Sequence, residues 1–135
     1  MGNREGAVFP AHLSSGGVLL LADVPDEQFE AIYSDERWTD RPGRPDRAAL
    51  RREMRLARRR GYSLNNGRTE IGVTAIGRSV HDSDGRAEAA VSISLPTARY
   101  SRTVLPTLVA ALAATTADIE RDLAAVLATP PTGAR

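Results

Sequence analysis

The sequence contains no cysteine, no lysine and only two histidines, His12 and His81. The lack of cysteine excludes a disulfide framework, a thiolate zinc site and a cysteine nucleophile, and two histidines alone do not form a structural metal cluster. We therefore expect neither a metal nor any other cofactor. All eighteen basic residues are arginine and alanine is abundant, which indicates a GC-rich genome and not a functional choice.

Long hydrophobic runs are missing as well. The longest, from Gly16 to Ala22, is far shorter than the roughly 20 residues that span a bilayer. No basic segment with a cleavage site precedes it. We therefore expect a cytoplasmic protein that has no membrane partner.

An excess of either charge is also absent, since eighteen basic residues and seventeen acidic ones give a net charge of +1. A chain this close to neutral has no overall field that attracts nucleic acid or an anionic membrane. Seven of the arginines lie between Arg47 and Arg60 on an expected helix. We interpret them as a solvated face and not as a DNA-binding surface, because the basic stripe is isolated.

The chain does have the length and the apolar content of one domain. With 135 residues, 41% of them hydrophobic, it can form one compact core but not two. We place this domain at residues 1–128. The remaining segment, Thr129 to Arg135, contains two prolines and a glycine and is expected to be disordered.

Four helices are expected, over about residues 15–22, 25–33, 46–60 and 101–128. Ser14 and Ser15 can cap the first, Pro25 suits the first turn of the second, Gly61 ends the third and Ser101 caps the last. The side chains expected to face the core from the last three helices are Phe29, Ile32 and Tyr33, then Leu50, Met54 and Ala57, then Leu105, Leu108, Leu112, Ile119, Leu123 and Leu127.

Three strands are expected between the third and fourth helices. They lie at about residues 62–64, 71–80 and 86–95 and are joined by the turn Asn65-Asn66-Gly67 and the tight hairpin Asp82-Ser83-Asp84-Gly85. In the last strand the period of two places Ser92 and Ser94 on one face and Val91 and Ile93 on the other.

This order of elements predicts an α+β domain in which helices cover one face of an antiparallel sheet. About three strands make a thin sheet for so many helices, so we expect a domain that is incomplete or that borrows strands from a partner. An exposed sheet edge and an uncovered helix face further predict a homo-oligomer.

Two candidates for chemistry are weak. His12 beside Ser14 or Ser15 could be a base and nucleophile pair, but the Gly-x-Ser-x-Gly elbow is missing and N-capping explains the serines better. Asp82 and Asp84 begin like a calcium loop, but no further ligands follow and the segment is a turn. We therefore expect no enzyme.

A polar cluster remains in a domain otherwise built from small apolar side chains. Ser92 and Ser94 on one strand face, the Asn65-Asn66 turn and the segment Ser14 to Gly17 offer donors suited to a carboxylate. Ligand sites have this composition, mostly apolar with a few placed polar groups. The alternative is ordinary: strand serines facing water, a turn and a capped helix.

Three segments, in this order, resemble the effector domain of the isocitrate lyase regulator (IclR) family of bacterial transcription regulators. The first is Phe9-Pro-Ala-His-Leu-Ser-Ser-Gly-Gly-Val-Leu-Leu-Leu-Ala22, and the second is Gly61-Tyr-Ser-Leu-Asn-Asn66 with Glu70-Ile-Gly-Val73. The third is Asp82-Ser-Asp-Gly-Arg86 with Val91-Ser-Ile-Ser-Leu-Pro96. The resemblance extends from about Phe9 to Ala125.

The resemblance implies a GAF-like (profilin-like) effector domain that is truncated on its N-terminal side and lacks the winged helix-turn-helix that reads DNA in this family. It implies a small organic or aromatic acid as effector and a homodimer or tetramer, with DNA bound only through the missing domain. By the same resemblance, effector contacts fall on Ser15, Gly16, Asn65, Ser92 and Ser94, with Phe9, Val73 and Ala75 as the apolar wall.

The sequence departs from the family pattern at several places. Asn65 stands where Asp is common, which removes a negative charge, and Val18 stands where the family usually has Lys. Arg78 and Ser79 replace a small residue and Pro, and Leu95 replaces the Gly before Pro96. If Leu95 shrinks the pocket, the chain is a ligand-free oligomerisation module descended from such a domain, which is the rival to a sensor.

Overall fold

The first helix begins at the predicted serine cap. In the computed structural model, which describes residues 5–128, the Ser14 hydroxyl accepts a hydrogen bond from the Gly17 N–H at 3.0 Å. The elements in chain order are η1 (Ala11–Leu13), α1 (Ser15–Asp23), α2 (Asp26–Ile32), α3 (Asp35–Trp38), α4 (Arg47–Arg60), β1 (Ser63–Asn66), β2 (Val73–His81), β3 (Ala87–Pro96), η2 (Thr97–Arg99) and α5 (Leu105–Ala128). The predicted disordered tail, 129–135, lies outside the described residues.

The three strands form one antiparallel sheet in the order β1-β2-β3, so the predicted fold class is confirmed. The predicted hairpin between β2 and β3 is also present: the Gly85 N–H donates to the Asp82 carbonyl at 3.0 Å, and the Asp82 carboxylate accepts from the N–H of Arg86. Gly85 has a φ of 79°, which only glycine adopts without strain. The predicted turn at Asn65-Asn66 is wrong, because both residues belong to β1.

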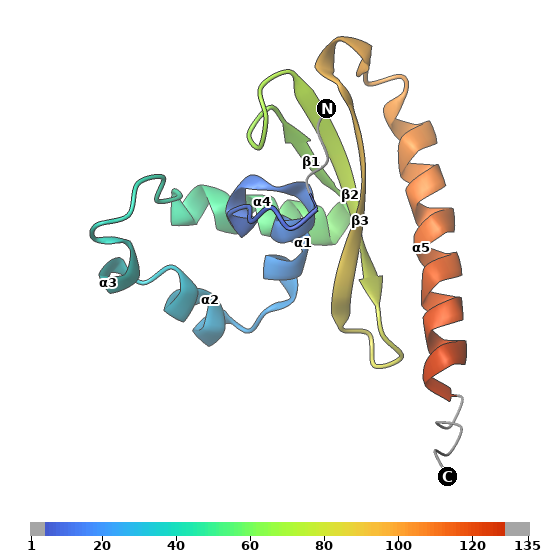
Figure 1. Cartoon of the computed structure of the whole chain (residues 1–135), viewed down its shortest axis with the longest axis horizontal. Helices are drawn as coiled ribbons and strands as arrows, with labels where there is room; N and C mark the ends of the chain where they lie inside the picture. Colours follow the sequence, from blue (N-terminus) through green and yellow to red (C-terminus); the bar gives the residue numbers. More distant parts are fainter. Residues whose placement is uncertain (1–4, 129–135) are drawn as a thin grey trace.

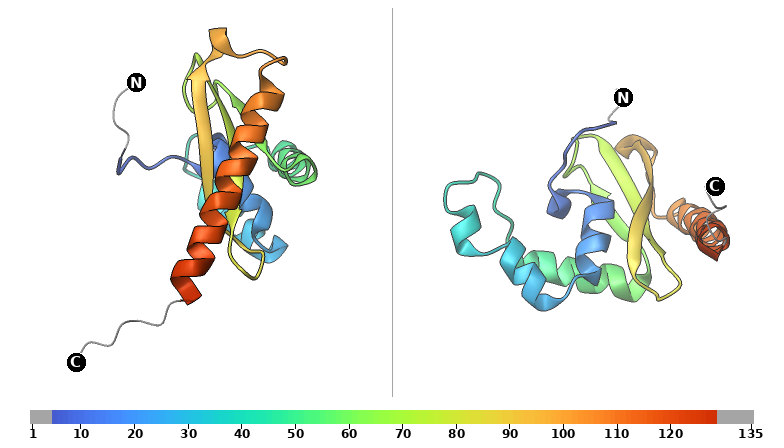
Figure 2. Two further views of the ribbon diagram at one scale, coloured as in Figure 1. Left: turned by 90° about the vertical axis from the view of Figure 1, so that its right-hand side faces the viewer. Right: turned by 60° about the horizontal axis from the view of Figure 1, so that its bottom comes forward.

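Helices cover both faces of this sheet, not one as the sequence suggested (Figures 1 and 2). Arg78 of β2 reaches Thr116 of α5, whereas Gly77, the preceding residue, lies against Leu19 of α1. Because successive strand residues point to opposite faces, the even-numbered residues of β2 face α5 and the odd-numbered ones face α1. Ile76 on the α5 face is completely buried.

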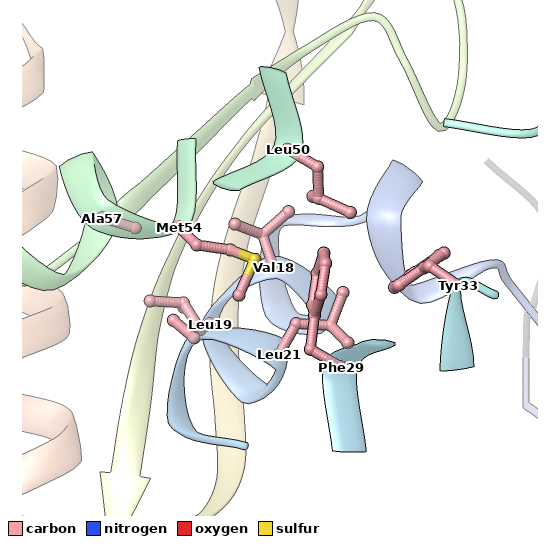
Figure 3. Close-up of a cluster of buried hydrophobic side chains, with 9 residues drawn as sticks. Val18, Leu19, Leu21, Phe29, Tyr33, Leu50, Met54 and Ala57 are labelled. Atoms are coloured by element: carbon pink, nitrogen blue, oxygen red, sulfur yellow. The ribbon is translucent and has the colours of Figure 1, made fainter. Parts of the chain in front are cut away.

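The main core lies on the α1 side of the sheet, between α1, α2 and α4 (Figure 3). Gly61 ends α4 with a φ of 78°, as the sequence predicts, whereas Asp46, expected to be the first residue of the helix, is its N-cap. The predicted inner stripe of α4 is confirmed. The buried side chains of this cluster are Val18, Leu19, Leu21, Ala22, Phe29, Tyr33, Leu50, Met54 and Ala57.

The final helix packs less completely than its stripe of leucines indicates. Leu112 and Thr116 are buried against the sheet, but Ile119 is 38% exposed and Leu127 is 70% exposed. The last turns of α5 lie beyond the end of β2, near the β2–β3 turn (Figure 1), and Leu123 and Leu127 there border an open hollow with Asp82 and Ser83. These turns remain an apolar surface in the described part of the chain.

Candidate functional site

A cleft of about 350 Å³ opens between the N-terminus of α1, the sheet and the β1–β2 loop. All of the effector contacts expected from the sequence line this one cleft. They come from four separate segments: Phe9 before η1, the start of α1, β1, and the paired strands β2 and β3. The complete lining is Phe9, Ser14, Ser15, Gly16, Asn65, Thr69, Glu70, Val73, Ala75, Ser92 and Ser94.

The start of α1 supplies backbone donors to the cleft. The Gly17 N–H is taken by the Ser14 cap, but the N–H groups of Ser15 and Gly16 belong to the first turn, where an α-helix provides no internal partner. The positive end of the helix dipole lies at the same place. This end of the cleft is therefore suited to a carboxylate or another small anion.

A pair of hydroxyls connects α1 to the sheet beside these donors. Ser15 Oγ and Ser92 Oγ are 2.9 Å apart, and Ser63 Oγ of β1 donates to the Ser15 carbonyl at 2.8 Å. Helix α1 can approach the sheet this closely because Gly77 has no side chain. A Cβ at this position would come within 3.1 Å of Ser92 Oγ and of Leu19. The absence of a side chain at Gly77 thus determines how far the cleft opens.

Asn65 organises the opposite wall. Its amide nitrogen donates to the Leu13 carbonyl and, at 2.7 Å, to Thr69 Oγ1, while its oxygen accepts from the Arg68 N–H at 3.0 Å. Thr69 Oγ1 in turn donates to the same Leu13 carbonyl at 2.6 Å. Both amide hydrogens of Asn65 are used within the protein, and the residue is 2% exposed. Asn65 therefore shapes the cleft through Leu13 and Thr69.

The apolar part of the lining comes from Phe9, Val73 and Ala75. Ala75 pairs with Ser94 across the β2–β3 ladder, and Gly77 pairs with Ser92. The two strand serines thus lie on the face that α1 covers, beside small residues that leave room. The cleft combines hydroxyl and N–H groups with apolar surface from Phe9, Val73 and Ala75, and the Glu70 carboxyl group belongs to the same lining.

Two departures from the family pattern lie outside the cleft. Arg78 faces α5, where it donates to Thr116 Oγ1 at 3.2 Å and also to the Gly61 carbonyl at 3.2 Å. Leu95 is one residue beyond Ser94, so it points to the α5 face as well. Neither residue is among those that line the cleft. Leu95 is therefore not placed to narrow the cleft.

The lining residues that sequence analysis did not assign to the site are Thr69 and Glu70. The sequence signal that could have indicated Thr69 is its position four residues after Asn65. In the structure Asn65 donates to the Thr69 hydroxyl. His12, considered as a catalytic base, is buried and contacts the Gly43 carbonyl at 3.2 Å and the Tyr33 hydroxyl at 3.4 Å. Burial lowers the pKa of His12.

Residues 5–128 contain no group of three or more histidine, aspartate or glutamate side chains that could hold a metal ion. Within the same residues, no helix is both long enough and apolar enough to cross a membrane.

Comparison with known proteins defines the class. A family model described as bacterial transcriptional regulator IclR, C-terminal, matches residues 1–121. A transcriptional regulator from Rhodococcus sp. RHA1 is 33% identical with a TM-score of 0.81, over 93% of this chain and 52% of its own. The IclR protein of Thermotoga maritima is 25% identical with a TM-score of 0.77, over 92% and 51%. The C-terminal domain of the E. coli transcriptional regulator KdgR is 29% identical with a TM-score of 0.73, over 85% and 71%.

No curated protein matches the chain at a significant level. The chain spans about half the length of the first two regulators of known structure. The fold and these matches define a regulatory domain of bacterial transcription regulators. The chain belongs to the IclR family and corresponds to its C-terminal domain.

Proposed function

We propose that this domain is a cytoplasmic sensor that binds a small organic or aromatic acid in the cleft and does not catalyse a reaction. The ligand would control DNA binding by a winged helix-turn-helix domain that is attached to this domain or has been lost from it. The regulator would be a homodimer or tetramer. A ligand exerts such control only through different affinities for two states of the regulator.

The observation that carries this proposal is the convergence of the predicted residues on one cleft. Its size lies within the usual range for small-molecule sites. Its polar groups come from the start of α1, from β3, and from Asn65, Thr69 and Glu70 in β1 and the β1–β2 loop. The carboxylate would lie at the N–H groups of Ser15 and Gly16 and at the hydroxyls of Ser92 and Ser94. The apolar body of the acid would contact Phe9, Val73 and Ala75.

The test is a calorimetric titration of small aliphatic and aromatic acids into the wild type and Ser92→Ala. A hydrogen bond to a charged group is worth roughly 1.5 to 3 kcal/mol, so Ser92→Ala should weaken binding about tenfold or more, since 1.4 kcal/mol is tenfold. Ser94→Ala should act in the same direction. Ser83→Ala, in the exposed β2–β3 turn, is the matched control and should bind like the wild type.

The rival function is a ligand-free oligomerisation module. It is favoured if no acid in the panel binds the wild type while the chain still self-associates. Equal binding by wild type, Ser92→Ala and Ser94→Ala would place the effector elsewhere and contradict the assigned contacts.

A further inference from the structure

Glu70 gives the cleft a polar group that the proposed function does not use. Among the described residues that line the cleft, it is the only one with a charged side chain, and it is half-buried. Its carbonyl accepts the Val73 N–H at 3.2 Å, so the loop that carries it closes at the start of β2. The cleft therefore holds a carboxyl group, which is an acceptor, as well as the donors at the start of α1.

The register of the sheet separates these two polar ends. Ser92 pairs with Gly77, where α1 lies against the sheet. Val73, beside the loop that carries Glu70, is four residues away from Gly77 along β2. At about 3.3 Å per residue, the backbone at the two ends is roughly 13 Å apart. Ala75 lies between them on the same face and adds only a methyl group to the lining. Apolar surface therefore separates the donors from the carboxyl group.

We propose that the effector is an ω-amino acid, with a carboxylate at one end, an ammonium group at the other and an apolar spacer between them. Its carboxylate binds at the start of α1, as in the proposed function, on which this inference rests. Its ammonium group donates to the Glu70 carboxylate. A carboxylate has two oxygens and about four acceptor sites, so Glu70 can receive a ligand donor in addition to the bonds that it makes within the protein.

Charge complementarity favours this class over other acids of the same length. A hydrogen bond between an ammonium group and a carboxylate is roughly twice as strong as one between neutral groups. A diacid would instead bring a second carboxylate against Glu70, and the like charges would repel each other. A simple monoacid ends in a methyl group there and makes no hydrogen bond. The cleft therefore discriminates among acids by the group at the far end of the ligand.

The apolar spacer distinguishes ω-amino acids from α-amino acids. In an α-amino acid the ammonium group is bonded to the carbon next to the carboxylate, so both charges would lie at the start of α1. The N–H groups of Ser15 and Gly16 and the positive end of the helix dipole meet the ligand at this place, and they disfavour a cation. A spacer that contacts Phe9, Val73 and Ala75 moves the ammonium group away from them.

Four six-carbon acids test the proposal by calorimetric titration into the wild-type chain, because they share a chain length and differ in one group. ε-Aminohexanoate should bind about tenfold more tightly than hexanoate, as expected for one hydrogen bond between charged groups. Adipate and α-aminohexanoate should bind more weakly than hexanoate, for the two reasons given above. γ-Aminobutanoate and butanoate repeat the first comparison with a shorter spacer.

Glu70→Gln keeps the shape of the side chain and removes its charge. In this variant the preference for ε-aminohexanoate over hexanoate should fall to about twofold or less, and adipate should no longer be disfavoured. Hexanoate itself should bind about as well as to the wild type. Glu27→Gln, at an exposed position of α2 that is not part of the cleft lining, is the matched control and should keep the wild-type preferences.

The wild-type titrations decide the question even if Glu70→Gln does not fold. If neither ω-amino acid binds more tightly than its parent acid, the inference is overturned while the proposed function stands, because an acid still binds. A preference that survives in Glu70→Gln, or an equal loss of affinity for every acid in that variant, would also overturn it, since Glu70 would then only maintain its loop. If the wild type binds no acid at all, the proposed function fails and this inference fails with it.

Discussion

Asn65 connects three segments of the cleft through one side-chain amide. Its donors hold Leu13 before α1 and Thr69 in the β1–β2 loop, and its oxygen holds the backbone at Arg68. An aspartate, common in the family at this place, has no N–H, so it could not donate to the Leu13 carbonyl, and its contact with Thr69 would need the hydroxyl as donor. The exchange to Asn therefore removes a negative charge from the cleft and also provides the donors that close its wall.

His12 makes the stability of the fold depend on pH. Its ring is buried, with Tyr33 and Trp38 packed edge-on, and desolvation lowers its pKa below the ordinary 6.5. The unfolded chain then binds a proton more readily than the folded chain. The stabilisation is fully present above about pH 6.5 and is lost as the pH falls toward the folded pKa. Denaturant unfolding between pH 7.5 and 5.5 should show falling stability.

The control for this prediction is His12→Gln, which keeps a donor for the Gly43 carbonyl but has no titrating ring. It should be less stable than the wild type at pH 7.5, because the aromatic contacts are lost, and its stability should change much less across the same window. A wild-type chain whose stability rises as the pH falls from 7.5 would contradict the argument.

At the scale of elements, the first turn of α1 contains two adjacent glycines, Gly16 and Gly17, whose surroundings differ. A Cβ on Gly17 would lie 2.2 Å from the Ala11 carbonyl oxygen, a clash of backbone with side chain that cannot relax without moving η1. A Cβ on Gly16 would lie 3.3 Å from the Ala90 Cβ, which a small shift relieves. Close packing of η1 against α1 therefore requires glycine at position 17 only.

The resulting prediction compares Gly17→Ala with Gly16→Ala by denaturant unfolding. Alanine gains about 1 kcal/mol over glycine in a helix, and overpacking costs about 1 to 3 kcal/mol or more. Gly17→Ala should lose at least about 2 kcal/mol of unfolding free energy, because its clash is severe, whereas Gly16→Ala should stay within about 1 kcal/mol of the wild type. Equal effects of the two substitutions would show that η1 does not constrain α1.

The elements most accurately predicted from sequence are those fixed by local chemistry. The Gly61 terminator and the 50-54-57 stripe define α4, and the Asp82–Gly85 turn defines the hairpin. The placement of α5 was not predictable in this way, because helical periodicity reveals an apolar face but not which side of a sheet it covers. The short helix α3 was missed, since four residues give too little periodicity.

The candidate site shows the same division. The period of two in β3 correctly places Ser92 and Ser94 on one face. Their meeting with Ser15 and Asn65 depends on contacts between residues 48 to 77 positions apart in sequence, as the Ser63–Ser15 and Ser15–Ser92 bonds illustrate. Residue chemistry grouped these segments as one polar cluster and the family resemblance assigned them to one site, but neither predicts the contacts between them. Asn65 was misread as a turn because an Asn-Asn-Gly sequence favours one, whereas pairing with β2 prevails here.

At the scale of the whole molecule, charge is unevenly distributed. Helix α4 carries seven arginines and one glutamate, so the rest of a chain with a net charge of +1 is acidic. Some of the acidic side chains lie against α4: Arg47 pairs with Glu30, and Arg51 pairs with Asp26 at 2.8 Å. The basic stripe of α4 is therefore partly neutralised by α2 within the same molecule, which supports its interpretation as a surface face.

This distribution predicts that the chain by itself binds no duplex DNA specifically. Sequence is read by side chains that a recognition element places at base edges. An isolated basic stripe that is partly paired with acidic residues of α2 is expected to contact phosphates instead, and the affinity of such contacts falls steeply with salt. At about 150 mM salt, fluorescence anisotropy with labelled duplexes should show no sequence-selective binding at sub-micromolar protein. At low salt, any weak binding should be independent of sequence and should decrease in an Arg55→Gln, Arg59→Gln variant, with Arg121→Gln on α5 as the control. Selective binding that survives physiological salt would show that this domain reads DNA directly, and the assignment of DNA recognition to a separate helix-turn-helix domain would be wrong.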